Sequence, residues 1–458
     1  MGLHHGPCRD MICVLFSTFF CPLPGRPKDR RIHLSQIKLF GGKGARSRGR
    51  AGSAGTETRP KKTRSPLKTL TIVFLILAAL EGLYFTCVYS NIPFIAKWRT
   101  IYIQTAMDTM RHQWLATAFI PQSVIDEAMS SRIAAKEEQT QHNSSDSWAD
   151  GKDSSDRTED SQTAPAVDTA EEAFYELFWE LDRSSMEAYL KKNPSALDQG
   201  WDNILINEAG LDDEGTAIQT TMGEQVLAID AQNQILLLRV KGSGYRGVLA
   251  VAKDPSRLSV KNSTMLGSAG QYAGTIAQNN GGILAMTGSS FIDEGGVGNG
   301  GILAGYAMSD GQGRGAHMGW SYKRLELRED NYLYIVDAQS EVHPDTTDAV
   351  EFTPAIIIDG NVLDTSGWNG LQPRAILGQS DRGEILMLVV EGRLLDSIGI
   401  SVADCAPILL DHNCMQALNL DGGTSAIMWY DGEYITRCSN TACPEGRPLP
   451  NAFVYEAS

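Results

Sequence analysis

The second half of the chain is a succession of short apolar runs separated by turn residues. Three runs between Gln225 and Lys253, QVLAID, QILLLRVKG and GVLAVAK, have the length and composition of buried strands. Further runs flank tight turns at Asp359–Gly360, 381–383 and Asp431–Gly432, which predicts hairpins. Strands outnumber helices, and hairpins join most neighbours. The pattern therefore predicts an α+β fold with mixed, mostly antiparallel sheets and a few helices.

Helical segments are expected before and within this β-rich region. Hydroxyl residues that commonly cap helix N-termini precede four of these segments, at Thr169, at Ser184 or Ser185, at Ser268 and at Ser401. Residues 98–129 have helical spacing and few helix-breaking residues before Pro121.

The longest apolar run lies nearer the N-terminus. TLTIVFLILAALEGLYFTCV, residues 69–88, has 20 residues and one charged side chain, Glu81. As a helix rising about 1.5 Å per residue it is roughly 30 Å long, which matches the hydrocarbon thickness of a bilayer. A signal peptide has a shorter apolar region and a cleavage site of small residues, whereas Val88 is followed by YSNIP. The run predicts one uncleaved transmembrane helix over 69–89.

Charge is divided unevenly across this run. Residues 1–68 carry 15 Lys and Arg against 3 Asp and Glu, a net charge of +12, which leaves −27 for the remaining 390 residues. The positive-inside rule predicts a cytoplasmic N-terminus, an extracellular body and a single-pass location in the cell membrane. Because the basic residues of the head are not interleaved with aromatic ones, we expect a juxtamembrane basic segment and no nucleic-acid partner.

Composition divides the rest of the chain into segments. The head, 1–68, is expected to be largely disordered, and whether its first 60 or so residues are a true part of the protein stays open. A juxtamembrane helical segment follows at 90–136, then an acidic, Ser-rich stretch at 137–168 that predicts a disordered stalk. Short helices at 169–200 precede the β-rich domain at 201–458.

Glycine is concentrated in one part of this domain. Sixteen of the 45 glycines lie between Leu266 and Gly319, around TGSSFIDEGGVGNGG at 287–301. Such a segment can bring backbone N–H groups close to a ligand because no Cβ intervenes. It lacks the spacing of a nucleotide-binding loop. Taken alone, it could equally be an irregular connection.

A second motif is NLDGGTSA at 419–426. The apolar strand CMQALNL ends in Asn419 and Asp421, a Gly-Gly turn follows, and Thr424 and Ser425 precede a new strand. Polar side chains at a strand end are a common way for a rigid scaffold to present a site. An ordinary turn is the alternative.

In combination these motifs resemble the phosphodiester glycosidase family, and most closely its membrane-anchored Gram-positive members of exopolysaccharide-biosynthesis type. The similarity runs from about Gly223 to Ala457 and includes GSSFIDEGGVGNGG, the Pro-Arg-Ala segment at 373–375, ALNLDGGTSAIMWYDGE and GRPLPNAFVY. The chain departs from many members at Thr287, where they have Asn, and at Glu391, where they have Asp.

The resemblance implies an extracellular hydrolase that cleaves the glycosidic bond of sugar-1-phosphodiesters of the N-acetylglucosamine type, in cell-surface polysaccharide or wall-polymer metabolism. Glycosidic cleavage usually employs two carboxylates, for which the candidates are Asp421, Glu391 and Asp293. Residues expected to bind the substrate through the two motifs are Asn419, Gly422, Gly423, Thr424, Ser425, Ser289 and Asn299. A membrane-tethered glycan-binding module without catalytic activity is the alternative.

The leaving group of such a substrate is a phosphomonoester with a pKa near ~6, so it needs cationic stabilisation more than a strong general acid. An arginine fork suits phosphate geometry, and Arg374 and Arg447 are the motif arginines of first choice, with Arg393 in reserve. No cofactor and no metal are expected, since the His residues are scattered. Cys438 and Cys443 could be bridged or free. The polymer, the stereochemical outcome and the oligomeric state stay open.

Overall fold

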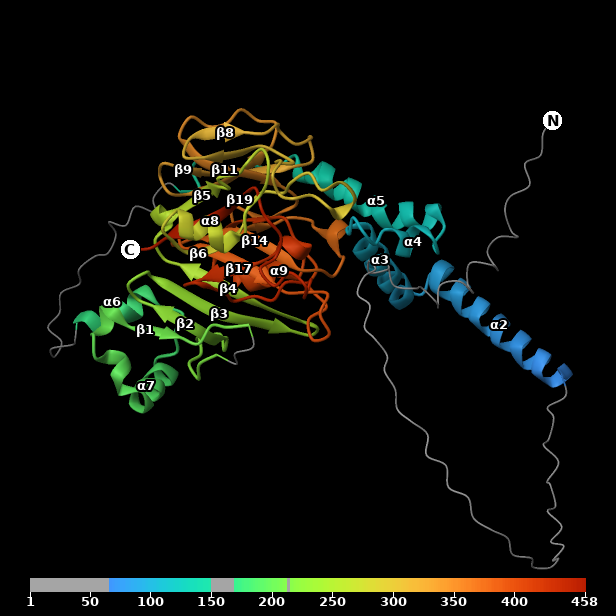
Figure 1. Ribbon diagram of the computed structural model, residues 1–458, viewed down its shortest axis with the longest axis horizontal. Coiled ribbons are helices and arrows are strands. Elements are labelled where there is room, and N and C mark those ends of the chain that lie inside the picture. The colour runs from blue at the N-terminus through green and yellow to red at the C-terminus, as the bar shows by residue number, and fades with distance from the viewer. Residues whose placement is uncertain (1–65, 150–168, 212–214) are drawn as a thin grey trace, which may run out of the picture. The chain divides into compact units, whose positions relative to one another are not determined.

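The computed structural model describes residues 66–149, 169–211 and 215–458, and its strands form three sheets (Figure 1). Every named strand pair in these residues is antiparallel, and few helices accompany the sheets, so the predicted α+β class is confirmed.

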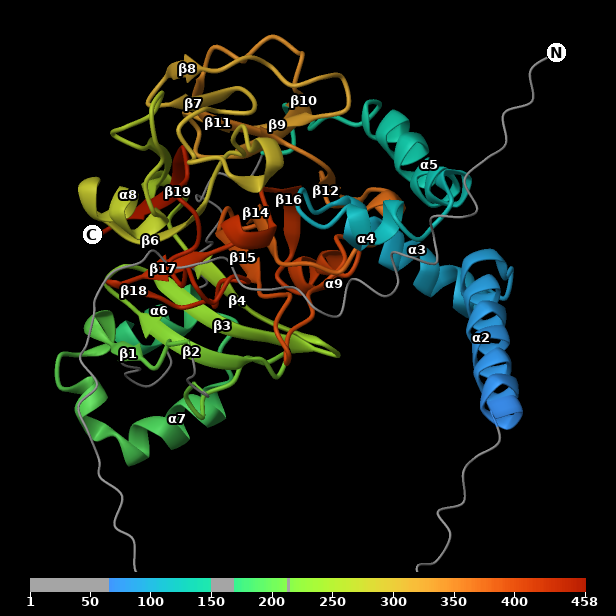
Figure 2. The ribbon, with the colours of Figure 1, turned by 45° about the vertical axis from the view of Figure 1, so that its right-hand side comes forward.

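The nine-stranded sheet has the order β1-β2-β3-β4-β15-β14-β16-β12-β13. Its strands are β1 (Leu205–Asn207), β2 (Gln225–Asp230), β3 (Ile235–Gly242), β4 (Tyr245–Ala252), β12 (Ala355–Ile358), β13 (Asn361–Val362), β14 (Arg374–Ser380), β15 (Ile385–Val390) and β16 (Cys414–Asn419). The hairpins expected at Asp359–Gly360 and 381–383 are the β12–β13 and β14–β15 turns. Figure 2 shows β14, β15 and β16 together in this sheet.

Two five-stranded sheets complete the domain. One has the order β10-β9-β11-β7-β8 and consists of β7 (Ala307–Ser309), β8 (Gln312–Arg314), β9 (Lys323–Arg328), β10 (Leu333–Asp337) and β11 (Thr346–Phe352). The other has the order β18-β17-β6-β19-β5 and consists of β5 (Leu258–Asn262), β6 (Gly282–Thr287), β17 (Met428–Tyr430), β18 (Glu433–Tyr434) and β19 (Asn451–Glu456).

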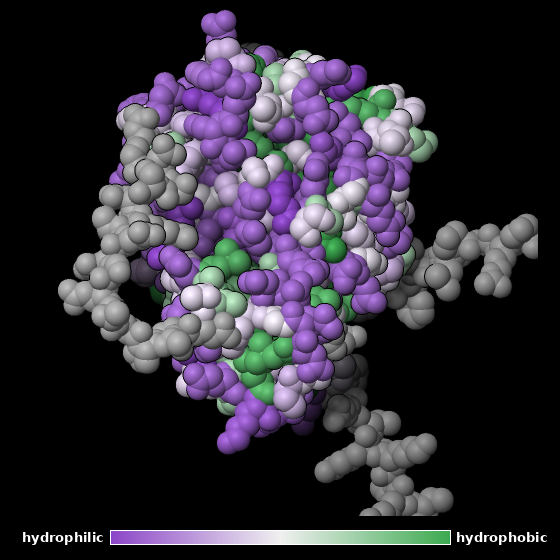
Figure 3. Space-filling view, turned by 90° about the vertical axis from the view of Figure 1, so that its left-hand side faces the viewer, coloured by the Kyte–Doolittle hydropathy of each residue, from purple (hydrophilic) through white to green (hydrophobic). Residues whose placement is uncertain are grey.

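The three sheets share one apolar core, because each contributes inward-facing side chains to it. Val248 of β4, Met286 of β6 and Leu325 of β9 are among its fully buried members. A second apolar cluster covers the other face of the nine-stranded sheet, where Phe178 and Leu409 pack. The outer surface differs: Figure 3 shows one face on which hydrophilic residues predominate, as expected for a domain surrounded by water.

Among the helices of the described residues, α2, α3 and α5 are the long ones. They are α2 (Pro66–Tyr89), α3 (Pro93–Met107), α4 (Trp114–Thr117), α5 (Gln122–Gln139), α6 (Thr169–Leu177), α7 (Arg183–Lys192), α8 (Ala273–Asn279) and α9 (Cys405–Leu410). Over Leu67–Tyr89, α2 is long and apolar enough to cross a membrane. The predicted disordered head lies almost entirely outside the described residues.

Three predicted helix starts are displaced. Ser401 lies four residues before α9, whose N-cap residue is Asp404, and the Ser401 hydroxyl accepts from the Asp404 N–H at 3.2 Å. Ser268 does not cap α8, because Gln271 and Leu449 exchange backbone hydrogen bonds of 2.9 and 2.7 Å and hold that stretch extended. At α7 the capping side chain is Asp182, which accepts from the N–H of Ser185 at 2.9 Å.

The boundary of the predicted stalk also differs from expectation. Residues 137–149 lie against the domain: Gln139 donates to the carbonyl of Ala355 at 3.1 Å, and the Ser144 N–H donates to the carbonyl of Ile335 at 2.8 Å. Trp148 is buried, with its ring 5.0 Å from that of Tyr332. Polar composition suggested a free segment, but several of its polar groups form hydrogen bonds with the domain. The rest of the predicted stalk, 150–168, lies outside the described residues.

Candidate active site

The strand register brings three motifs that are separated in sequence to one end of the nine-stranded sheet, here called the site edge. Arg374 begins β14 opposite Val390 at the end of β15, and Ile376 pairs with Asn419 at the end of β16. The pairing continues past the strand, because the Leu420 N–H donates to the carbonyl of Ala375 at 2.8 Å. The Pro-Arg-Ala segment, Glu391 and the Asp421 turn therefore meet where these strands end.

Asp421 occupies the centre of this edge. Its side chain is partly open to solvent, yet protein surrounds it closely enough that desolvation raises the pKa of Asp421 to about 6. Hydrogen bonding from Ser425 and the positive charge of Arg447 oppose that shift only in part. A carboxyl with such a pKa can both accept and release a proton near neutrality.

The two glycines of the turn are required by close approaches. A Cβ on Gly422 would lie 2.7 Å from the carbonyl oxygen of Pro373. Gly423 has a φ of +62°, and a Cβ there would lie 3.1 Å from Nη1 of Arg393. The predicted Gly-Gly turn thus lets the chain pass between the Pro373 backbone and the Arg393 guanidinium.

Asp293, from the glycine-rich segment, is held by Arg447. The two side chains form a bidentate pair whose Nη2–Oδ1 bond is 2.8 Å, and the Gly298 N–H donates to Asp293 at 2.7 Å. Arg447 is the main reason that the pKa of Asp293 lies below its usual range. Both members of this pair interact electrostatically with Asp421. The site therefore contains two carboxyl groups whose pKa values are displaced in opposite directions.

Glu391, the third carboxylate candidate, is enclosed. Arg437 donates to it from the backbone N–H at 2.9 Å and from Nε at 2.8 Å, and Arg246 lies 3.5 Å away. Its side chain has no exposed surface. These contacts tie the end of β15 to the segment after β18, so the geometry gives Glu391 a supporting position and leaves no face of it for a substrate.

Two of the three candidate arginines are, like Glu391, already occupied by contacts within the fold. Arg374 is buried and donates to the carbonyls of Gly370 at 2.8 Å and Ile400 at 3.3 Å, and desolvation lowers its pKa to about 10. Arg447 is occupied by Asp293. Arg393 is exposed, with Gln372 as its hydrogen-bond partner at 3.2 Å, and it lies against Gly423 beside Asp421. Of the three, the reserve candidate Arg393 is the exposed residue, although desolvation lowers the pKa of its guanidinium.

Most of the remaining predicted residues form hydrogen bonds within the fold around the site. Asn419 is buried and donates to the carbonyl of Thr353 at 2.9 Å. Ser289 is buried and bound by both ends of the Asn451 amide, at 2.7 and 3.0 Å. Asn299 is exposed and bridges the Ser268 carbonyl to the N–H of Gly301. Ser425 lies under Asp421, and Thr424 stays partly exposed beside it.

Sequence reasoning missed some of the residues that hold the site. Arg437 lies in a stretch without any recognisable pattern, and nothing there pointed to a partner for Glu391. Asn451 could have been singled out, because it belongs to the closing GRPLPNAFVY segment. Its pairing with Ser289 could not be predicted, because the two residues are 162 positions apart in the sequence.

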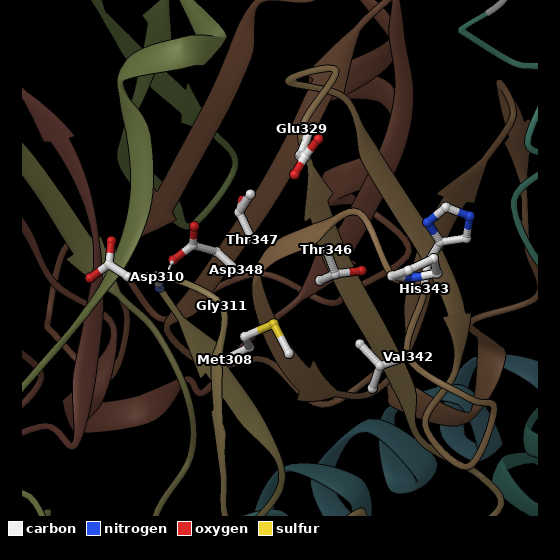
Figure 4. A pocket seen from close by; sticks show the side chains of 10 residues that line it. Met308, Asp310, Gly311, Glu329, Val342, His343, Thr346, Thr347 and Asp348 are labelled. Carbon is white, nitrogen blue, oxygen red and sulfur yellow. Dashed lines mark hydrogen bonds between the residues drawn. The ribbon is translucent and has the colours of Figure 1, made fainter.

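Two cavities are found in the described residues. The larger, of about 620 Å³, is beside β7 and β11, and Figure 4 shows Asp310, Glu329 and Asp348 around it. Asp348 accepts from the Val260 N–H at 2.9 Å and Asp310 pairs with Lys261, so both carboxylates have partners in the fold. No predicted site residue lines either cavity. Among the described residues, no group of three or more His, Cys, Asp and Glu side chains could hold a metal ion, and Cys438 and Cys443 are free thiols.

Comparison with known proteins gives one family and several distant structures. Residues 274–456 match the family model described as phosphodiester glycosidase. A 72-residue stretch, 16% of the chain, is 36% identical to the SPbeta prophage-derived uncharacterized protein YomE of Bacillus subtilis, and spans only 11% of that protein.

Two solved structures are similar at low identity. The zebrafish N-acetylglucosamine-1-phosphodiester alpha-N-acetylglucosaminidase catalytic domain, auto-inhibited by its pro-peptide, is 18% identical with a TM-score of 0.40, over 49% of this chain and 82% of that one. A hypothetical protein from Synechocystis is 13% identical with a TM-score of 0.36, over 51% and 63% of the two chains.

The raised pKa of Asp421 predicts a pH-dependent stability difference. An aspartate in the unfolded chain ionises near ~3.9, whereas Asp421 in the fold ionises at about 6, so folding takes up a proton between these values. Asp421 therefore destabilises the fold progressively as the pH rises from about 4 to about 6. Asp421→Asn should melt close to the wild type at pH 4 and gain relative stability up to pH 6, with no further gain above. A melting-temperature difference that stays constant from pH 4 to pH 7 would contradict this.

Proposed function

We propose, from the match of residues 274–456 to the phosphodiester glycosidase family model, that the protein is a membrane-anchored hydrolase that cleaves the glycosidic bond of sugar-1-phosphodiesters at the cell surface. Its substrate would be an N-acetylglucosamine-phosphodiester type of linkage in a polysaccharide or wall polymer. The observation that carries the proposal is the pair of carboxyl groups, Asp421 and Asp293, with pKa values displaced in opposite directions at one glycine-rich site.

In the proposed reaction the bond between the anomeric carbon and the phosphate oxygen breaks, and water supplies the hydroxyl that replaces it. The products are a free sugar and a phosphomonoester. Asp421 is placed to exchange a proton with the water or the departing oxygen. Asp293, kept ionised by its ion pair with Arg447, is the second carboxylate of the proposed reaction.

The leaving phosphate needs a cation more than an acid. Arg393 supports this role because it is exposed, adjoins the Asp421 turn and has an amide, Gln372, as its hydrogen-bond partner. Arg374 donates only to backbone carbonyls in the contacts described, so we assign it to the support of the turn.

The location is inferred from α2 and from the charge on its two sides. One helix long and apolar enough for a membrane precedes the domain. With +12 before it and −27 after it, we propose a cytoplasmic N-terminus and an external catalytic domain.

A protease added to intact cells should therefore remove the domain that follows α2, because that domain would be the part of the chain outside the cell. Immunoblotting with antibodies to each side of α2 measures this. Complete protection of the C-terminal part, in cells whose other surface proteins are digested, would show that the topology is wrong.

Loss of the central carboxyl should abolish turnover. Asp421→Asn is expected to reduce kcat/KM on an N-acetylglucosamine phosphodiester by about 10²-fold to 10⁴-fold, the usual contribution of a positioned acid or base. Asp431→Asn, which changes the exposed Asp-Gly turn between β17 and β18, is the matched control and should retain activity. Turnover by the full-length protein in detergent micelles is the measurement. Near-normal activity of Asp421→Asn would remove that residue from the reaction, and binding without turnover in the wild type would favour a glycan-binding module.

The cation at the turn should matter only for phosphate substrates. Arg393→Gln is expected to slow a phosphodiester by about 10²-fold, the scale of one lost oxyanion donor. An activated aryl glycoside has no phosphate to stabilise, so its hydrolysis should change much less. Arg314→Gln, at an exposed arginine of β8, is the control for the loss of positive charge. Equal losses on both substrates would show that Arg393 binds the sugar or supports the fold.

A further inference from the structure

Helices α3 and α5, which precede the domain, contact the loop at 367–371 beside the site. They lie outside residues 274–456, which match the family model. Gln104 of α3 accepts from the Asn369 N–H at 2.8 Å, and Thr105 accepts from the Leu371 N–H at 3.0 Å. On α5, Arg132 donates to the carbonyl of Gly367 at 2.8 Å. These bonds hold the loop that leads into the Pro-Arg-Ala segment.

The turn that follows α3 continues this contact toward the Asp421 turn. Asp108, the C-cap residue of α3, forms an ion pair with Arg132 at 2.6 Å and accepts a hydrogen bond from Gln372 at 2.9 Å. Gln372 in turn accepts from Arg393 at 3.2 Å. A chain of polar contacts therefore runs from the turn after α3 to the exposed guanidinium beside Gly423.

Arg111 lies three residues further along, against the glycine-rich segment. A Cβ on Gly296 would lie 2.9 Å from its Cγ and 3.1 Å from its Nε, so the arginine stem occupies the space that the missing side chain leaves. The side chain is exposed, and no hydrogen bond or ion pair to Arg111 is found among the described residues. Its charge acts on Asp293, whose pKa it helps to lower.

We propose that Arg111 is an anion-binding residue of the substrate site, supplied by the segment between the predicted membrane helix and the domain, and that it binds the phosphate-bearing part of the substrate. The inference rests on the proposed function for its choice of ligand. Arg447 is neutralised by Asp293 and Arg374 is buried, whereas Arg111 and Arg393 are exposed arginines at this edge and neither has a carboxylate hydrogen-bond partner among the contacts described. Guanidinium groups suit phosphate oxygens, and a strongly acidic domain needs local cations to bind an anion.

The test is the binding of inorganic phosphate to the full-length protein in detergent micelles, measured by titration calorimetry. Arg111→Ala should weaken phosphate binding about tenfold, the scale of one charged hydrogen bond, and Arg111→Lys should restore part of it. Lys97→Ala, at an exposed cation of α3, is the matched control and should leave the affinity unchanged. The same variants are then compared on a phosphodiester and on an aryl glycoside.

The outcomes separate this inference from the proposed function. A wild type that binds phosphate through Arg111 but hydrolyses neither substrate would leave the binding residue standing and overturn the hydrolase. Unchanged phosphate affinity in Arg111→Ala, or no phosphate binding by the wild type, would overturn the inference. Equal losses on both substrates with unchanged phosphate affinity would mean that Arg111 acts only through Asp293, which also overturns it.

Discussion

The pairing of β14 with β15 on one side and β16 on the other is the constraint on which the site depends. The three strands follow one another along the chain, and their hydrogen bonds place Arg374, Glu391 and Asp421 at one end of the strands. Side chains alternate between the faces of a sheet, so a slip of one residue in β16 would turn Asp421 to the opposite face. Asn419 opposes such a slip, because its amide is bonded to the carbonyl of Thr353 on the neighbouring connection.

The arginines around the site differ in their partners: some are already paired with carboxylates or backbone carbonyls of the fold, and others are not. Arg437 and Arg246 compensate the buried charge of Glu391, and Arg447 compensates Asp293. Arg374 is satisfied by carbonyl dipoles. A charge that is already compensated in the fold has little left to offer an anion, and removing its partner would leave an unpaired buried group. Only geometry can make this distinction, since all of these residues are simply arginines in the sequence.

The sequence predicted those elements whose causes are local. Apolar runs around tight turns predicted the hairpins β12–β13, β14–β15 and β17–β18. The Gly-Gly pair predicted a turn, and glycine is needed at both positions because of the close approaches found there. The sheet that contains β9 was not predicted. Its strand reads KRLELR and is entirely buried, because Glu326 pairs with Arg324 at 2.8 Å and with Arg328 at 3.0 Å. Charges that neutralise one another inside the fold look like surface residues in a sequence. The burial of Glu391 could likewise not be predicted from the sequence, because its partners Arg437 and Arg246 lie in distant segments.

The docking of α3 has a consequence for where the protein can work. Only three residues separate α2 from α3, and Gln104 and Thr105 of α3 hold the loop beside the site. A helix rises about 1.5 Å per residue, so these anchoring residues are roughly 20 Å along the chain from the end of α2. The described segments on either side of 150–168 are attached to the domain, at Trp148 and at Phe174. If α2 crosses the membrane as proposed, this short connection would keep the site close to the lipid surface.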